Sequence, residues 1–280
     1  MSTISKKPII KTLSGPNPGP TVTIMAGVHG NERQGVYALK IAQKKFKIIA
    51  GKVHWIIANP GALSKNKRFL EMNLNRAFRE KKQLSKEQLN SYERSLAEQI
   101  MPFLDESSAL LDLHSVSNLP ATPFIISEPE NFNIAKKFPF EIISSGWGKV
   151  HPGSTDEFMN ERKKIGICVE CGHHKDASSK SRALLSIQIF LSSFGIIKKR
   201  NYKNSVSPKV IAPEFIYKCS NNFKVKSLFP DFTFVKKGAL LGFDGKEKIN
   251  APFSGYIIFA GDCDVAGMES FVLGKKKRLA

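Results

Sequence analysis

Short apolar, β-branched runs alternate with amphipathic segments along the first two thirds of the chain. Residues 21–28 form the first such run, and apolar residues recur at helical spacing in residues 32–46. Residues 52–60 form a second run, which ends at Asn59-Pro60. Because alternating strands and helices build parallel units, the pattern predicts an α/β domain over residues 1–200, with a mixed, mostly parallel sheet covered by helices.

Further elements continue this alternation. Strands are predicted at residues 109–115, 122–127, 140–145 and 165–172, and helices at residues 85–104 and 179–197. The helix at 85–104 begins with Ser85 and Gln88 at the spacing of a capping box.

The pattern changes at about residue 205. Apolar runs within residues 209–220, 232–243 and 249–261 are short, are separated by Gly, Pro and Asn, and show no helical spacing. A second, small all-β domain is therefore predicted over residues 205–280. Residues 198–207 are the predicted linker.

The chain is strongly basic, with 43 Lys and Arg residues against 24 Asp and Glu residues and a net charge of +19. The basic residues are spread along the sequence, and no nucleic-acid-binding motif accompanies them. We therefore expect a generally basic surface that attracts small anionic substrates, and no specific nucleic-acid partner. A nucleic-acid binder remains the rival, and steep salt dependence of DNA or RNA binding would support it.

The remaining sequence features bear on the cellular compartment of the protein. No apolar run approaches the roughly 18–20 residues of a membrane helix, and the N-terminal residues lack the apolar region of a signal peptide. Four scattered cysteines are too few for a disulfide scaffold. These features predict a cytoplasmic protein without a membrane partner, and they are compatible with a homo-oligomer.

Polar side chains that could bind a metal ion or take part in catalysis follow several predicted strands. "GVHGNERQG" places His29 and Glu32 after the first strand, "DLH" places Asp112 and His114 at the end of another, and a late strand carries Glu170. Ligands gather where the strands of open α/β sheets end. Two imidazoles and one carboxylate are a usual set for a catalytic zinc ion, and Asp112 could orient them. Taken alone, the His29–Glu32 pair is more typical of a polar surface turn than of a metal site.

A basic segment lies between these blocks. "KNKRFLEMNLNRAF", residues 65–78, holds Arg68, Asn75 and Arg76. Guanidinium groups bind carboxylates and stabilise developing oxyanions, although a lone arginine is usually a solvated surface charge.

Taken in order, "GVHGNERQG", "NPGA", "RFLEMNLNRAF", "DLH" and "VECG" resemble the succinylglutamate desuccinylase/aspartoacylase family, relatives of the zinc carboxypeptidases. The resemblance covers roughly residues 20–195. It implies a zinc-carboxypeptidase-like catalytic domain, and the β-rich C-terminal region also looks like the second domain that such proteins carry.

The resemblance implies a role for each matching residue. His29, Glu32 and His114 match the family's ligands for one zinc ion per chain, and Glu170 matches the glutamate that activates water. Zinc lowers the pKa of water from 15.7 toward ~7, and a glutamate general base can pass the proton to the leaving amine.

The basic segment matches the family's substrate-binding residues. Arg68 matches the arginine that polarises the scissile carbonyl, and Asn75 and Arg76 match the pair that holds a substrate carboxylate. The resemblance thus implies a zinc-dependent amidohydrolase.

The chain departs from the family before the catalytic glutamate. Aspartoacylases carry a tyrosine and an arginine there that help to grip the substrate, whereas this chain has Arg162, eight residues before Glu170. Asp156, Glu157 and Glu161 would repel a dianionic substrate. The expected substrate is an N-acyl amino acid or small peptide with a free carboxylate. A carboxypeptidase acting on short peptides and a non-catalytic binding protein remain the alternatives.

A second metal motif, "CVECGHH", contains Cys168 and Cys171. On a strand, Cys168 shares a face with Glu170 and Cys171 points the other way, so the two thiols cannot chelate together. Both are expected to be buried strand cysteines. We expect His173 or His174 to border the site, and His54 and His151 to be structural or exposed.

Overall fold

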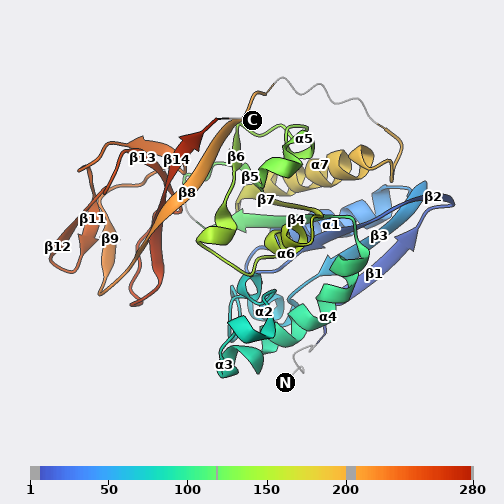
Figure 1. Ribbon diagram of the computed structural model, residues 1–280, viewed down its shortest axis with the longest axis horizontal. Coiled ribbons are helices and arrows are strands. Elements are labelled where there is room, and N and C mark those ends of the chain that lie inside the picture. The colour runs from blue at the N-terminus through green and yellow to red at the C-terminus, as the bar shows by residue number, and fades with distance from the viewer. Residues whose placement is uncertain (1–6, 118, 200–205, 279–280) are drawn as a thin grey trace.

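A mixed sheet of eleven strands runs through the part of the chain that the computed structural model describes, residues 7–117, 119–199 and 206–278 (Figure 1). Its strand order is β1-β3-β2-β4-β7-β5-β6-β8-β14-β13-β10. In chain order these strands are β1 (Ile9–Ser14), β2 (Asn17–Ala26), β3 (Ala50–Ile57), β4 (Ala109–Val116), β5 (Phe124–Ser127), β6 (Ile142–Ser144), β7 (Ile165–His173), β8 (Lys209–Lys218), β10 (Thr233–Val235), β13 (Gly255–Ile258) and β14 (Glu269–Lys277). The predicted α/β class is confirmed.

The centre of the sheet is parallel. β3, β2, β4 and β7 pair side by side in the same direction, so their carboxyl ends meet along one edge. β1 and β5 run antiparallel to their neighbours β3 and β7. All eight residues of β4 are buried, as expected for a strand covered on both faces.

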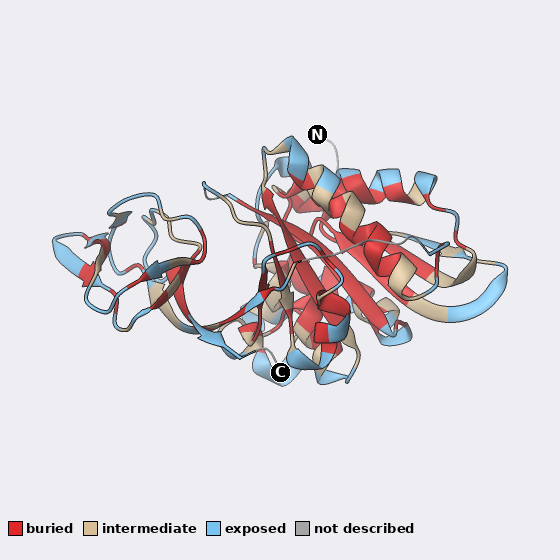
Figure 2. Cartoon of the chain, turned by 90° about the horizontal axis from the view of Figure 1, so that it is seen from above, coloured by how far each residue is buried: buried red, intermediate tan, exposed pale blue. Residues whose placement is uncertain are grey.

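Helices cover both faces of this central sheet. The helices are α1 (Arg33–Lys45), α2 (Pro60–Lys65), α3 (Lys86–Leu89), α4 (Tyr92–Glu106), α5 (Phe132–Ala135), α6 (Thr155–Glu161) and α7 (Ala177–Ser193). Apolar residues of α1, α5 and α7 pack on one face, and those of α4 and α6 on the other. Figure 2 shows the buried strands between these layers. No helix in the described ranges is long and apolar enough to cross a membrane.

The single helix predicted at residues 85–104 is wrong, because two helices occupy this segment. α3 ends at Leu89 and α4 begins at Tyr92. Ser85 caps α3 as the capping box predicts, but the Ser91 side chain also accepts a hydrogen bond from the Arg94 N–H. This second N-cap starts a new helix where the apolar spacing alone suggests continuity.

The C-terminal region continues the large sheet. β8 pairs in parallel with β6 and antiparallel with β14, which carries the sheet into the all-β part of the molecule (Figure 1). A smaller sheet there contains β9 (Phe223–Val225), β11 (Leu240–Asp244) and β12 (Glu247–Asn250). Residues 206–278 contain no helix. The division into domains at 1–200 and 205–280 stays a prediction, and residues 200–205 of the predicted linker lie outside the described ranges.

An apolar cluster joins the two regions beside the carboxyl ends of the strands. Its members are buried and come from both sides of the predicted boundary: Phe124, Ile142, Trp147, Ile211, Phe232, Ile258 and Val272. This contact fixes the C-terminal region next to β5 and β6.

Candidate active site

The turn after β2 carries His29 and Glu32. Gly30 in this turn packs so closely on α2 that a Cβ atom there would lie 2.1 Å from the backbone carbon of Ala62. The Asn59 side chain, at the start of "NPGA", accepts a hydrogen bond from the Ala62 N–H and caps α2. The "GVHG" and "NPGA" blocks therefore form one packed corner, which sets the direction of the His29 side chain.

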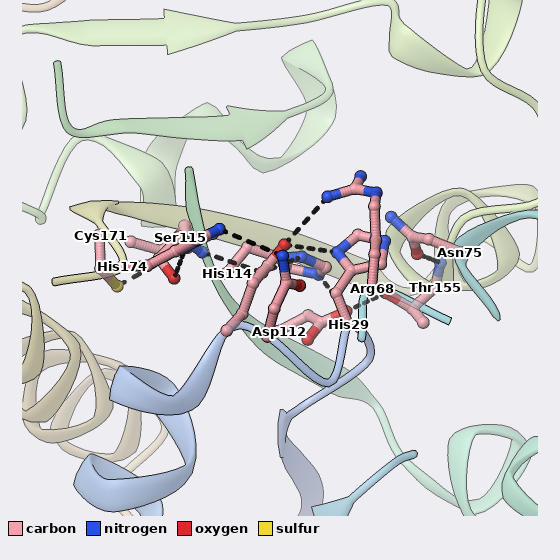
Figure 3. Close-up of polar contacts among 12 residues, drawn as sticks. His29, Arg68, Asn75, Asp112, His114, Ser115, Thr155, Cys171 and His174 are labelled. Carbon is pink, nitrogen blue, oxygen red and sulfur yellow. Dashed lines mark hydrogen bonds and ion pairs between the residues drawn. The ribbon is translucent and has the colours of Figure 1, made fainter. Parts of the chain in front are cut away.

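The three predicted metal ligands meet at this corner, and Figure 3 labels two of them, His29 and His114. His29 Nδ1 lies 2.6 Å from Glu32 Oε1, and His114 Nδ1 lies 3.1 Å from Glu32 Oε2. All three side chains are buried, and their ligand atoms lie within 4.8 Å of one another. The two imidazole rings are 5.1 Å apart between centroids.

The atoms that face away from this centre have partners of their own. His29 Nε2 forms a hydrogen bond of 3.0 Å with Asn73 Oδ1, and His114 Nε2 lies 2.9 Å from Asp112 Oδ2. The Glu32 carboxylate accepts a hydrogen bond from the backbone N–H of Ser115. Such outer partners orient imidazole ligands and leave the opposite nitrogen free for a metal ion.

The charges in this cluster suit a divalent cation. Burial opposes ionisation of Glu32, but His29 and His114 hold its pKa well below the usual range. Burial and the charge of Arg68 lower the pKa of His29 to about 4, which keeps that imidazole neutral. Burial opposes protonation of His114, but Asp112 and other neighbours raise its pKa well above normal. A zinc ion would take the place of that proton, and the two imidazoles with one carboxylate fit its preferred donors.

Glu170 lies beside the cluster on β7, directly opposite His114 of β4. Its side chain is buried, and its Oε2 atom has no hydrogen-bond partner. Burial raises the pKa of Glu170 to about 8. Burying a carboxyl group without a hydrogen-bond partner destabilises the folded state, so such groups are often functional. Glu170 is therefore a candidate for proton transfer.

One cavity of about 580 Å³ brings the predicted residues together. The site residues predicted from the sequence all line it: His29, Glu32, Arg68, Asn75, Arg76, His114 and Glu170. Their assignment to metal, catalytic and substrate-binding roles stays a prediction.

The basic residues occupy the side of the cavity formed by the segment after α2. Arg68 donates a hydrogen bond of 3.2 Å to Glu32, and its half-exposed side chain reaches toward the metal ligands (Figure 3). Asn75 accepts a hydrogen bond from the backbone N–H of Thr155. Burial, and then the charge of Arg68, lower the pKa of Arg76 to about 10, so this guanidinium remains a cation at neutral pH.

Glu93 supports this segment, and sequence reasoning missed it. The side chain is fully buried at the start of α4 and accepts hydrogen bonds from the backbone N–H groups of Leu70, Glu71 and Met72. Glu93 thereby fixes the loop between Arg68 and Asn75. The signal in the sequence was weak, because an acidic residue in the first turn of a helix is common.

Tertiary contacts set the positions of two further residues that the sequence analysis singled out. His151 lines the cavity, where its ring stacks on Trp147 and its Nε2 lies 2.7 Å from Glu269. Arg162, which precedes Glu170 by eight residues, donates a hydrogen bond to Asp105 and is not among the residues that line the cavity. In each case the direction of the side chain follows from tertiary contacts that the sequence does not display.

The other histidine and cysteine expectations are confirmed. His174 contacts the hydroxyl of Ser115 beside the ligand cluster, and His54 is buried in contacts with surrounding side chains. Cys168 lines the cavity, whereas Cys171 belongs to the core on the opposite side of the sheet. The two thiols therefore do not share a metal.

Comparisons with known proteins place the fold and the motifs in context. Residues 18–186 match the model of the succinylglutamate desuccinylase/aspartoacylase catalytic domain. A probable aspartoacylase of Acaryochloris marina is 33% identical over 163 residues, which are 54% of each chain. An aspartoacylase of Xenopus tropicalis is 33% identical over 129 residues, which are 42% of this chain and 41% of the relative. The matches thus span about half the length of these relatives or less.

A solved structure with a similar fold covers more of the chain. Succinylglutamate desuccinylase from Vibrio parahaemolyticus superposes with a TM-score of 0.75 at 17% identity, covering 96% of this chain and 86% of that one. This likeness shows the shared fold, including the β-rich C-terminal region. With the catalytic-domain match over more than half of the sequence, the chain belongs to the succinylglutamate desuccinylase/aspartoacylase family.

Proposed function

We propose that this protein is a zinc-dependent hydrolase that cleaves the amide bond of a small N-acyl amino acid. The observation that carries the proposal is the position of Glu170, whose unpartnered carboxyl lines the same cavity as the cluster of His29, Glu32 and His114. The family's named members, aspartoacylases and succinylglutamate desuccinylases, are consistent with an acylated amino acid as substrate.

Each side chain has a defined task in this proposal. His29, Glu32 and His114 would hold a zinc ion, which supplies Lewis acidity and lowers the pKa of water from 15.7 to about 7. Beside the bound cation Glu170 would be ionised, so that it accepts a proton from the attacking water at its free oxygen and then delivers that proton to the nitrogen of the leaving amine.

The basic residues bind and orient the substrate. The Arg68 guanidinium donates hydrogen bonds to the carbonyl oxygen as negative charge develops on it. Asn75 and Arg76 bind the free carboxylate, which places the scissile bond between Glu170 and Arg68. The outcome is one free carboxylic acid and one free amine.

The test compares zinc content and turnover in the wild-type protein and Glu170→Gln. A panel of N-acyl amino acids and short peptides is assayed for released amine, and bound zinc is measured on the same samples. We expect about one zinc per chain in both proteins, and a loss of roughly 10²–10⁴-fold in kcat for Glu170→Gln, because this change removes only the general base. Glu87→Gln, an exposed change on α3, is the control.

Three results would contradict the proposal. Full activity in Glu170→Gln would exclude this residue as the base. An absence of bound zinc and of turnover in the wild type, after incubation with zinc, would favour a binding protein on the same fold. Hydrolysis confined to short peptides would favour the carboxypeptidase alternative.

A further inference from the structure

The cavity has an apolar side that the chemistry of amide cleavage does not use. Ile126, Val150, Ile216 and Phe259 line it and are only partly buried, and Trp147 lies behind them in the apolar cluster that joins the two regions. We call these five residues the apolar wall. A wall of this kind leaves hydrocarbon surface facing solvent inside a site whose other sides are polar, which is the usual sign of an apolar ligand group.

The apolar wall adjoins the residues that are proposed to bind the substrate carboxylate. The segment that carries Trp147 and Val150 continues into Gly153, whose carbonyl accepts a hydrogen bond from the Phe78 N–H. The next residues reach Asn75, because the backbone N–H of Thr155 donates to its side chain. A ligand group at the wall would therefore lie close to a carboxylate held by Asn75 and Arg76, as the side chain of an amino acid does.

Two charged groups at this end of the cavity, His151 and Glu269, are already paired with each other. His151 stacks on Trp147 at 5.6 Å between ring centroids, and its Nε2 atom lies 2.7 Å from Glu269. Asp156 also lines the cavity. A second substrate carboxylate would meet these acidic groups and a hydrocarbon surface, which makes its burial unfavourable.

We propose that the cavity selects N-acyl amino acids with a large apolar side chain, above all an aromatic one, over those with a carboxylate side chain. The inference rests on the proposed function for the reaction and on the apolar wall for the choice of substrate. An aromatic ring would pack against the wall beside Trp147 and Phe259 and gain contacts typical of aromatic pairs.

The rival for substrate choice is Lys218. Its exposed side chain lines the cavity at the end of β8 and could hold a second carboxylate. The apolar-wall hypothesis and the Lys218 hypothesis predict that different substitutions change the substrate preference. Val150→Arg adds a cation to the wall itself, whereas Lys218→Met removes the existing cation and leaves the wall intact.

The experiment measures binding as well as turnover with N-acetyl-L-phenylalanine and N-acetyl-L-aspartate. Turnover is assayed with the zinc-loaded wild type, and dissociation constants are measured by calorimetry on Glu170→Gln. We expect the phenylalanine compound to be preferred by at least about tenfold in both measurements. Val150→Arg should reduce that preference by at least about tenfold. Leu228→Arg, the same kind of change at an exposed apolar residue, should leave it unchanged.

The outcomes separate this inference from the proposed function. Tighter binding of the aspartate compound, lost in Lys218→Met, would overturn the inference while leaving amide hydrolysis intact. Preferential binding of the phenylalanine compound without any turnover would support the apolar wall and contradict the proposed reaction. Equal binding of the two compounds, or an unchanged preference in Val150→Arg, would also overturn the inference.

Discussion

Asp231 is a buried carboxyl that couples stability to pH. One of its oxygens accepts a hydrogen bond of 2.7 Å from the Phe259 N–H, and the other has no partner. Burial raises the pKa of Asp231 from 3.8 to about 6. The folded state therefore holds the proton more tightly than the unfolded state, so the stability that Asp231 contributes is full below about pH 4 and is lost as the pH rises through 6.

Asp231→Asn removes this titration while keeping the side-chain shape and the acceptor for Phe259. We expect the stability of the variant relative to wild type to rise by about 1–3 kcal/mol between pH 4.5 and pH 7.5. Urea unfolding of both proteins at the two pH values measures the difference. The contributions of groups that titrate in both proteins cancel in the comparison. A difference in the free energy of unfolding between variant and wild type that does not change with pH would therefore contradict the raised pKa of Asp231.

Site residues that belong to a recognisable local pattern of strand and turn could be predicted from the sequence. His29, Glu32 and His114 follow strands of an α/β sheet, and neighbouring parallel strands bring their carboxyl ends together, so their meeting followed from the pattern. His151 and Glu93 could not be predicted in the same way. The direction of His151 depends on its ion pair with Glu269, and that of Glu93 on the loop after α2, and both partners are distant in sequence.

At the scale of an element, the loop between α2 and η1 (Leu74–Arg76) depends on α4 for its shape. Three consecutive backbone N–H groups of this loop point at the Glu93 carboxylate. In Glu93→Gln, one oxygen becomes an NH₂ group that faces donors. We expect a loss of about 2 kcal/mol in the free energy of unfolding, measured with urea.

Asp105→Asn is the matched control on the same helix, because Asp105 is 53% exposed in its surface ion pair with Arg162. Its free energy of unfolding should stay within about 0.5 kcal/mol of wild type. Equal losses in the two variants would mean that the buried carboxylate does not hold the loop.

The central strands were predictable because continuous apolar runs are typical of strands covered on both faces. The split between α3 and α4 was not, since apolar spacing continues through Ser91, whereas α3 ends at Leu89 and the hydrogen bond from Arg94 to Ser91 begins α4. The pairing of β8 with β6 was also beyond the sequence pattern. Pairing partners far apart in a chain are set by the whole sheet and leave no local signal.

For the whole molecule, the two predicted domains share a sheet and an apolar cluster. Removing everything after Lys199 would delete β8 and β14 and uncover buried side chains such as Phe124 and Trp147. We expect a chain that ends at Lys199 to aggregate or to lack a cooperative unfolding transition. Thermal unfolding followed by circular dichroism, beside the full chain, measures this. A truncated chain that unfolds cooperatively within a few degrees of the full chain would show that residues 1–200 form an independent domain.

The cavity is lined by residues that the ribosome delivers at very different times. The three histidine and glutamate ligands and Glu170 lie in the first 170 residues, whereas Ile216, Phe259 and Glu269 lie near the end of the chain. Because synthesis proceeds from the N-terminus, a nascent chain paused before β8 has made every proposed metal ligand while one side of its cavity is still missing. The proposed metal ligands are thus synthesised before the residues that are proposed to discriminate between substrates.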